Sequence, residues 1–282
     1  MRILTFDIED WFHILDNSST KTPEQWEQFT PRIHEGVDRI LNLLAENNLK
    51  GTFFCLGWVA RKYPEIIKKI DANGYEIATH SDIHQLAYEQ TRAQYKADLE
   101  QSVKCLEDVT GKKVIAYRAP GFSITEQNKW ALEVLIELGI EIDCSIFPAN
   151  RAHGGFASFK EATPCLIDVG GALLKEFPIN LYSWLGYKFI FTGGGYFRLL
   201  PYNIIKRLSS EAKYIMTYFH PRDFDPDQPI LKNLSFIRRF KSYYGLNGCL
   251  SKLNRLVKHY DFIDLRRADE SIDWQKMEVI KL

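Results

Sequence analysis

The sequence has few cysteines, and no two of them have the spacing of a metal-binding or redox motif. The five are widely scattered, at Cys55, Cys105, Cys144, Cys165 and Cys249. An odd number without any CxxC spacing argues against both a disulfide framework and a thiolate zinc site. We therefore expect five buried free thiols, which pack as small apolar side chains.

The sequence also lacks net charge and long apolar runs. Its 36 basic and 36 acidic residues give a formal net charge of zero, and no run of Lys or Arg compensates locally, so we expect no nucleic-acid partner. The opening MRILTFDIED has no apolar signal core. The uncharged apolar runs stop well short of the roughly 20 residues that span a bilayer. These features predict a cytoplasmic protein without a membrane span.

What the sequence does contain is a regular alternation of short apolar runs and longer amphipathic ones. The runs expected to form strands are 2–8, 51–56, 75–79, 114–118, 140–144 and 213–219, and most of them are separated by helix-like stretches such as 33–49 and 94–111. Strands joined by helices of this length imply right-handed crossovers and a parallel sheet. The predicted fold class is therefore α/β, and we expect a single domain over residues 1–282.

Two regions depart from this alternation. Residues 147–200 are interrupted by prolines and glycines, including the triple glycine 193–195, which favours an irregular insertion or short antiparallel strands at the edge of a barrel. Further helices are expected within residues 233–260, after the broken and polar segment HPRDFDPDQP at 220–229. No linker marks a second domain.

Acidic, histidine and arginine residues stand where the predicted strands end. Asp7, Glu9 and Asp10 end the first run, His80 and His84 follow YEIAT, Arg118 follows VIAY, and His220 follows YIMTYF. The carboxyl ends of parallel strands open onto one face, so these side chains can converge although they are far apart in the sequence. Imidazoles and carboxylates on that face predict a metal-hydrolase site.

The acidic residues of FDIED have more than one interpretation. Strand alternation puts Asp7 and Glu9 on the same face, and Asp10 can join them if the strand has already ended. Three acids within four residues repel one another without a cation, but Asp10 can equally be the N-cap of a following turn. His80 and His84 are four residues apart, which on one helical turn would place both rings on the same side as ligands of a divalent ion.

Arg118 and His220 have residue types suited to the two sides of such a site. Arg118 precedes the turn Pro120-Gly121-Phe122, where its guanidinium can hold a carboxylate in bidentate fashion and a backbone N–H can face a developing oxyanion. The imidazole of His220 can release a proton near neutral pH. Aromatic residues near these motifs, such as Trp11 and Phe122, are candidates for stacking on a sugar, although aromatic side chains more often belong to a core.

Read in order, TFDIEDWF, HSDIH, YRAPGFS, IDCSIFP and FHPRDFDP resemble the polysaccharide deacetylases, the NodB-homology group also called carbohydrate esterase family four. The resemblance runs from residue 3 to about residue 265. FDxEDWF, RAPGFS, GGGYFR and HPxxxDPxQP are similar to motifs of the cytoplasmic branch associated with exopolysaccharide and O-antigen gene clusters. The resemblance to this family implies a distorted (β/α) barrel of about seven strands.

The resemblance also implies the removal of the N-acetyl group from an amino sugar, with Zn²⁺ or another divalent transition metal such as Co²⁺ or Ni²⁺. Carried over by motif, Asp7 is the catalytic base, His80 and His84 are metal ligands, Arg118 orients the base and His220 is the general acid. Many relatives have adjacent aspartates in the first motif. Strand alternation favours Glu9 as the third ligand here, with Asp10 as the alternative.

Two departures from the family pattern bear on the site and the substrate. The late DxxDW signature is present only as residues 143–147, so the support of Arg118, or a contact with substrate, falls to Asp143. Without an export signal, a nucleotide-linked or lipid-linked sugar fits better than an insoluble polymer. The alternatives are a hydrolase of cyclic amides or ureides with the same barrel, and a carbohydrate-binding relative without turnover.

Overall fold

The computed structural model describes residues 1–282 except 16, 152, 185–186 and 232–233. Its main sheet has eight strands, and six of them are parallel neighbours. The alternation predicts five of these six, and the sixth lies within residues 147–200. In sheet order the strands are β12 (Val279–Lys281), β7 (Cys165–Val169), β8 (Ala172–Glu176), β6 (Ile142–Asp143), β5 (Ala116–Tyr117), β4 (Glu76–Thr79), β3 (Thr52–Cys55) and β2 (Thr5–Ile8).

Short pairings carry the sheet onward from β2 and curve it into a distorted α/β barrel. β1 (Arg2–Ile3) pairs in parallel with β11 (Ile215–Met216), and an isolated bridge joins Phe6 to Phe219. Another bridge joins Gly193 to Tyr218. The strand that precedes His220 therefore lies beside β2, so the first and last site motifs of the sequence meet.

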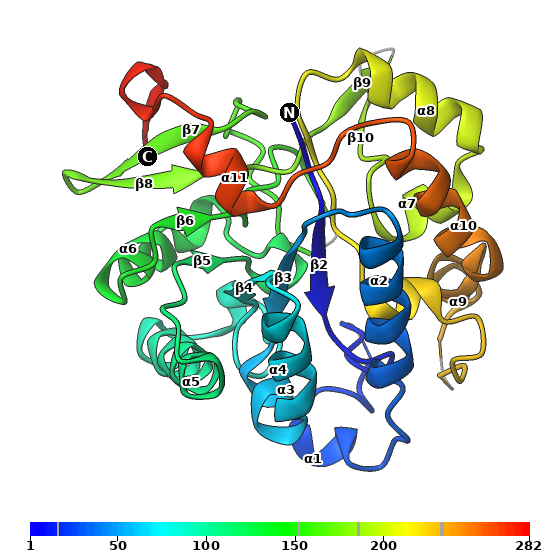
Figure 1. Ribbon diagram of the computed structural model, residues 1–282. Coiled ribbons are helices and arrows are strands. Elements are labelled where there is room, and N and C mark those ends of the chain that lie inside the picture. The colour runs from blue at the N-terminus through cyan, green and yellow to red at the C-terminus, as the bar shows by residue number, and fades with distance from the viewer. Residues whose placement is uncertain (16, 152, 185–186, 232–233) are drawn as a thin grey trace.

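Helices cover the outside of the strands (Figure 1). They are α1 (Pro23–Trp26), α2 (Ile33–Glu46), α3 (Gly57–Lys62), α4 (Pro64–Ala72), α5 (Arg92–Thr110), α6 (Trp130–Glu137), α7 (Gly194–Leu199), α8 (Tyr202–Glu211), α9 (Phe236–Tyr243), α10 (Leu246–Val257) and α11 (Leu265–Glu270). Single 3₁₀ turns are η1 (Ala87–Glu89), η2 (Pro120–Phe122), η3 (Glu126–Asn128), η4 (Pro221–Phe224) and η5 (Trp274–Lys276). No helix within the described part of the chain combines the length and the apolar character needed to cross a bilayer.

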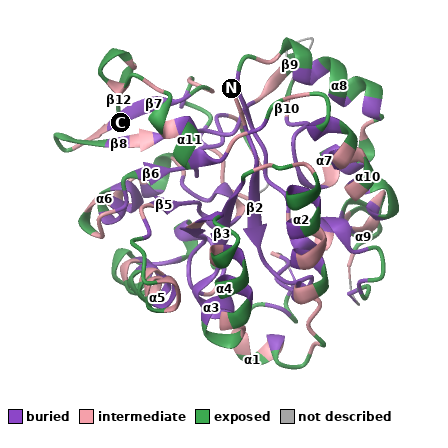
Figure 2. Ribbon diagram, in the orientation of Figure 1, coloured by how far each residue is buried: buried purple, intermediate pink, exposed green. Residues whose placement is uncertain are grey.

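The interior consists of the strands and the inward faces of these helices, whereas the outer helix faces are exposed (Figure 2). All five cysteines are buried and unpaired, which confirms the prediction of free thiols. Within residues 147–200 the chain forms two antiparallel hairpins. One is β7–β8, and the other joins β9 (Tyr182–Trp184) to β10 (Tyr187–Phe189).

Helix α2 packs closely against the segment that follows His220. A Cβ atom added to Gly36 would lie 2.6 Å from the Cβ of Pro221 and 2.9 Å from its carbonyl carbon and oxygen. Backbone atoms at these distances cannot move aside as a flexible side chain could. Gly36 is therefore required for the approach of α2 to η4, which places His220.

We expect Gly36→Ala to destabilise the protein even though alanine is the better helix former. The gain in helix propensity is about 1 kcal/mol, whereas overpacking costs roughly 1–3 kcal/mol and here also displaces backbone. Gly248→Ala in α10 is the matched control, because no atom lies within 4 Å of the added Cβ. Denaturant unfolding should show a lower free energy of unfolding for Gly36→Ala and a slightly higher one for Gly248→Ala. Equal effects would contradict the close contact.

Candidate metal centre and active site

The residues predicted at the strand ends lie at one end of the barrel. Glu9 follows β2, His80 follows β4, Arg118 follows β5, and His220 follows the residue bridged to Phe6. Asp7 is within β2 itself, two residues before Glu9, so both side chains lie on the same face. The parallel register therefore gathers side chains from four separate segments of the sequence.

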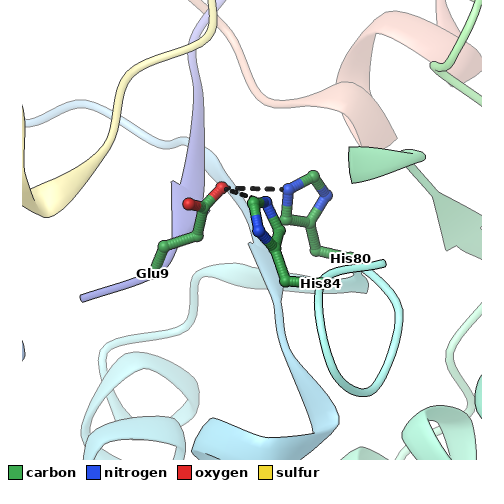
Figure 3. A group of neighbouring side chains, drawn as sticks. All are labelled: Glu9, His80 and His84. Carbon is green, nitrogen blue, oxygen red and sulfur yellow. Dashed lines mark hydrogen bonds and ion pairs between the residues drawn. The ribbon is translucent and has the colours of Figure 1, made fainter. Parts of the chain in front are cut away.

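A carboxylate and two imidazoles form the centre of the site (Figure 3). Glu9 Oε1 lies 3.1 Å from His80 Nε2 and 3.0 Å from His84 Nε2, and all three side chains are buried. The ring of His80 donates from Nδ1 to the carbonyl oxygen of Arg118 at 2.8 Å. Since a carbonyl can only accept, this bond leaves the Nε2 lone pair of His80 directed at the carboxylate.

An imidazole nitrogen lone pair and a carboxylate oxygen at this distance require a cation or a proton between them. The ligand atoms of Glu9, His80 and His84 all lie within 4.8 Å of one another. Two imidazole nitrogens and one carboxylate oxygen are ligands that Zn²⁺ prefers at sites that keep a position open for water or substrate. The donor set therefore fits a divalent transition metal.

His80 and His84 converge through a loop and not through a helical turn, so that part of the prediction is wrong. Ser81 and His84 have positive φ values of 72° and 54°, a conformation that is uncommon for residues other than glycine. The carbonyl oxygen of Ser81 accepts from Gly57 N–H and from the hydroxyl of Ser102. Contacts from α3 and α5 thus hold the loop in the shape that brings the two rings together.

Asp10 does not lie with the ligands. Its carboxylate accepts hydrogen bonds from the backbone N–H groups of Trp11, Arg32 and Ile33, at 2.7, 3.0 and 3.3 Å. It therefore holds the start of α2, which the sequence did not predict, and not only the turn that follows it, as the N-cap interpretation expected. The structure corrects the alternative that Asp10 is the third ligand and leaves Glu9 in that position.

Asp7 is held by Arg118. The Nη1 atom of Arg118 donates to Asp7 Oδ1 at 2.6 Å and to Thr5 Oγ1 at 2.8 Å. The contact uses one nitrogen, so the bidentate geometry expected from the sequence is not formed. The guanidinium is completely buried and lies 4.1 Å from the centre of the Phe54 ring. This buried guanidinium pairs with the Asp7 carboxylate and limits its rotation.

His220 lies next to both Asp7 and Glu9. Its Nε2 atom is 3.7 Å from Glu9 Oε1 and 3.9 Å from Asp7 Oδ2. Its Nδ1 atom lies 3.1 Å from Asp223 Oδ2. Burial favours the neutral ring, but Glu9, Asp223 and Asp7 outweigh it and raise the pKa of His220 to about 9. The side chain of His220 is 21% exposed, more than those of Asp7 and Glu9, so the site opens toward solvent on this side.

Sequence reasoning did not identify Asp223 and Arg198, which support His220. Asp223 also accepts from the backbone N–H of His220 and pairs with Arg198 Nε at 3.3 Å. The nearby arginine outweighs burial and lowers the pKa of Asp223 to about 2. A signal for both was present, because Asp223 stands three residues after His220 and Arg198 ends the GGGYFR motif.

Asp143 was expected to support Arg118 or to contact substrate, and its complete burial excludes the contact with substrate. The hydroxyl of Ser145 donates to it. Glu176, its partner in the register of β6 and β8, lies against its carboxyl group. Burial raises the pKa of Asp143 to about 6 and the pKa of Glu176 well above its usual range. Since two adjacent buried carboxyl groups cannot both be charged without a cation between them, we infer that the pair holds a proton. Glu176 had no recognisable sequence signal.

The aromatic candidates occupy different environments. Trp11 belongs to the core, because its Nε1 atom donates to the Thr30 carbonyl and its ring packs on Phe29, so the prediction of a substrate contact is wrong. Phe122 lies beside the site with its ring edge-to-face against Tyr218, at 5.3 Å between centroids. Its N–H donates to the Ala119 carbonyl and is not free for an oxyanion.

Comparison with family models divides the chain near residue 143. Residues 4–142 match the model described as polysaccharide deacetylase, and residues 144–270 match a domain of unknown function, DUF3473. Among curated proteins, the peptidoglycan deacetylase of Helicobacter pylori is 26% identical over 53% of this chain and 47% of its own length. A peptidoglycan-N-acetylglucosamine deacetylase of Bacillus cereus is 33% identical over 38% of this chain and 36% of its own length. The chain thus spans about half or less of the length of these relatives.

Solved structures share the fold over nearly the whole chain. A Mycobacterium smegmatis protein provisionally assigned to the polysaccharide deacetylases covers 99% of this chain and 92% of its own, with a TM-score of 0.69 and 20% identity. A family 4 carbohydrate esterase from Streptomyces lividans has a TM-score of 0.50, 12% identity and coverage of 93% and 90%. A family 4 pseudoenzyme from Bacillus anthracis has a TM-score of 0.51, 12% identity and coverage of 100% and 69%.

These findings confirm the predicted fold class, a distorted α/β barrel of the NodB-homology deacetylase type. The family model links residues 4–142 to the polysaccharide deacetylases, and the curated relatives that match parts of the chain are named as deacetylases.

The shared proton of Asp143 and Glu176 predicts a pH dependence of stability. The folded protein holds this proton more tightly than the unfolded chain does. The stabilisation of the fold by the proton is therefore complete below the ordinary carboxyl pKa, and it is lost as the pH rises through the raised pKa of the folded pair. Glu176→Gln keeps a donor toward Asp143 and an acceptor for Ile146 N–H, so we expect its melting temperature to fall less with rising pH. Thermal unfolding across a pH series measures this, with exposed Glu100→Gln as control. Parallel pH profiles for all three proteins would contradict the shared proton.

Proposed function

We propose that the protein is a metal-dependent hydrolase that removes the N-acetyl group from an amino sugar. The observation that carries this proposal is the placement of four functional side chains around Glu9. Two imidazoles face its Oε1 atom at 3.0 and 3.1 Å, and the ligand atoms of Asp7 and His220 lie within 4.8 Å of the same carboxylate. A base, an acid and a metal-ligand set therefore share one small volume.

Glu9, His80 and His84 would hold the metal ion, with Zn²⁺ as the first choice and Co²⁺ or Ni²⁺ as alternatives. A divalent ion at such a site polarises an acetamide carbonyl and acidifies a water molecule. The hydrogen bond from His80 to the Arg118 carbonyl orients the ring and leaves Nε2 free as a ligand atom.

Asp7 is the proposed general base. Its Oδ1 atom is occupied by Arg118, so Oδ2, on the side of His220, is the oxygen that takes the proton from water. His220 is the proposed general acid, because its raised pKa keeps the ring protonated near neutral pH. It delivers this proton from Nε2 to the departing amine, while Asp223 holds Nδ1. Acetate and a free amino sugar result.

The relatives guide the choice of substrate. Those reported above are peptidoglycan deacetylases, and two further relatives are chitooligosaccharide deacetylases from Azorhizobium caulinodans and Sinorhizobium fredii. An N-acetylated hexosamine is the unit common to these names. We propose a cytoplasmic enzyme of the exopolysaccharide and O-antigen branch, acting on a nucleotide-linked or lipid-linked form of such a sugar.

Replacing the proposed base or the proposed acid should strongly lower the rate of turnover without removing the metal. We expect Asp7→Asn and His220→Ala to lower acetate release from N-acetylhexosamine oligosaccharides by roughly 10²–10⁴-fold, the usual contribution of a positioned acid or base. Asp38→Asn and His34→Ala are controls, because both side chains are about half-exposed and pair with Lys69 and Glu65 on the surface. Wild-type turnover in both site variants would exclude the assigned roles.

The same assay separates the proposal from its alternatives. Ring opening of a cyclic amide or ureide without acetate release would indicate a different amide hydrolase. The fold alone does not identify an enzyme, since the Bacillus anthracis pseudoenzyme shares it. Absence of turnover by the metal-loaded wild type would indicate a carbohydrate-binding relative.

Metal content should distinguish Glu9 from its acidic neighbour. We expect Glu9→Ala to lose most of the bound metal in elemental analysis, because it removes the only carboxylate facing both imidazoles within the described residues. Asp10→Ala should keep the metal and lose about 1–2 kcal/mol of unfolding free energy, because three backbone N–H groups lose their acceptor. Metal loss in Asp10→Ala with retention in Glu9→Ala would reverse the ligand assignment.

A further inference from the structure

Helix α9 exposes a continuous apolar surface that the proposed reaction does not use. Phe236 is 84% exposed and Ile237 is 66% exposed, and Phe240 and Tyr244 are about half-exposed. At 3.6 residues per turn, positions i, i+1, i+4 and i+8 fall on one side of a helix. The Phe240 and Tyr244 rings are in contact, 4.7 Å apart between centroids and tilted by 31°. We call these four residues the apolar stripe.

The opposite face of α9 is anchored to the protein. Ser242 is buried, and its carbonyl accepts from Arg198 Nη1 at 2.7 Å and from Arg222 Nη2 at 3.4 Å. Arg238 Nη2 donates to the Leu15 carbonyl at 2.9 Å. The apolar stripe is thus held outward by a fixed helix, at the level of the β2 arrowhead in Figure 1.

Basic residues flank the apolar stripe on both sides. Arg239 and Lys241 are exposed, and the helical turn places one on each edge of the stripe. The helix has no acidic residue. Single exposed apolar residues are common on soluble proteins, but a stripe of aromatic and aliphatic residues between two cations is typical of helices that lie in a membrane interface. The cations complement anionic headgroups and the stripe fits among the acyl chains.

Helix α9 is connected to the candidate active site through Arg198. Arg198, which donates to the carbonyls of Lys241 and Ser242, also pairs with Asp223, the partner of His220. His220 is the side on which the site opens to solvent. Through Arg198 and Asp223, the C-terminal end of α9 is thus connected to the residue at the open side of the site.

We propose that α9 docks the protein on an anionic bilayer and that its amino-sugar substrate is carried by a lipid at that surface. The first part stands on the apolar stripe and its flanking cations, and the second rests on the proposed function. The protein binds the surface of the membrane without crossing it.

Vesicle co-sedimentation of the full chain tests the docking. We expect binding to vesicles of equal parts phosphatidylglycerol and phosphatidylcholine, and little binding to phosphatidylcholine alone. Phe236→Ser combined with Phe240→Ser should lower binding roughly tenfold or more, because two exposed aromatic side chains no longer enter the bilayer. The matched control is Leu173→Ser combined with Ile204→Ser, which removes exposed apolar side chains from β8 and α8 and should bind as wild type.

Replacing the two flanking cations tests the electrostatic contribution to vesicle binding. Arg239→Gln with Lys241→Gln should lower binding by about fivefold for each residue, equivalent to about 1 kcal/mol each. Lys206→Gln with Lys258→Gln removes the same charge elsewhere and should have little effect. Equal losses in test and control variants, or equal binding to neutral vesicles, would overturn the proposal. The proposal would also be overturned if the wild type were a dimer that does not bind vesicles and the Phe236/Phe240 variant were a monomer. The apolar stripe would then be a protein interface.

Activity on two substrates separates this inference from the proposed function. The Phe236/Phe240 variant should release acetate from a soluble N-acetylglucosamine oligosaccharide at the wild-type rate. It should be slower on the same sugar linked through phosphate to a long alkyl chain embedded in anionic vesicles. Equal rates on the embedded sugar would overturn the lipid-linked substrate. Vesicle binding by a protein that deacetylates neither compound would overturn the proposed function and leave the docking intact.

Discussion

The site depends on one buried carboxylate. Glu9 Oε1 faces the Nε2 atoms of His80, His84 and His220 within 3.7 Å, and its side chain has almost no contact with solvent. Burial alone would favour a neutral acid, but the surrounding imidazoles lower the pKa of Glu9 well below its usual range. A carboxylate that must stay charged in the interior needs positive charge beside it. The arrangement of the other side chains follows from this requirement.

Each remaining buried charge near the site has its own compensation. Arg118 neutralises Asp7, Arg198 neutralises Asp223, and the second acidic pair, Asp143 and Glu176, shares a proton. This separation keeps the base, the acid and the metal-ligand set from exchanging roles. Removing one partner of such a pair leaves an uncompensated buried charge, so the supporting residues are as tightly constrained as those that would contact substrate.

Much of the site could be predicted from the sequence because its residues stand next to strand ends. Asp7, Glu9, His80, Arg118 and His220 all lie within two residues of an apolar run, and a parallel sheet brings such positions together. Alternation along the first strand also favoured Glu9 correctly over Asp10 as the neighbour of the histidines. The α/β class followed from the same local pattern.

What could not be predicted depends on contacts between distant segments. The loop from His80 to His84 has its shape because α3 and α5 bind the Ser81 carbonyl, and no local periodicity reports this. The role of Asp10 was decided by N–H groups more than twenty residues away, at Arg32 and Ile33. Glu176 meets Asp143 only through the register of two strands separated by the irregular region.

Arg198 connects the chemistry of the site to the outer surface of the protein. Its guanidinium donates to two carbonyls at the C-terminal end of α9 and faces the Asp223 carboxylate with the same group. Free carbonyls at a helix end attract a cation, and a buried aspartate requires one, so a single arginine satisfies both. As a result α9 cannot shift independently of the loop that carries His220. An orientation imposed on the helix by a membrane surface would reach the proposed acid through rigid contacts, without a flexible linker between them.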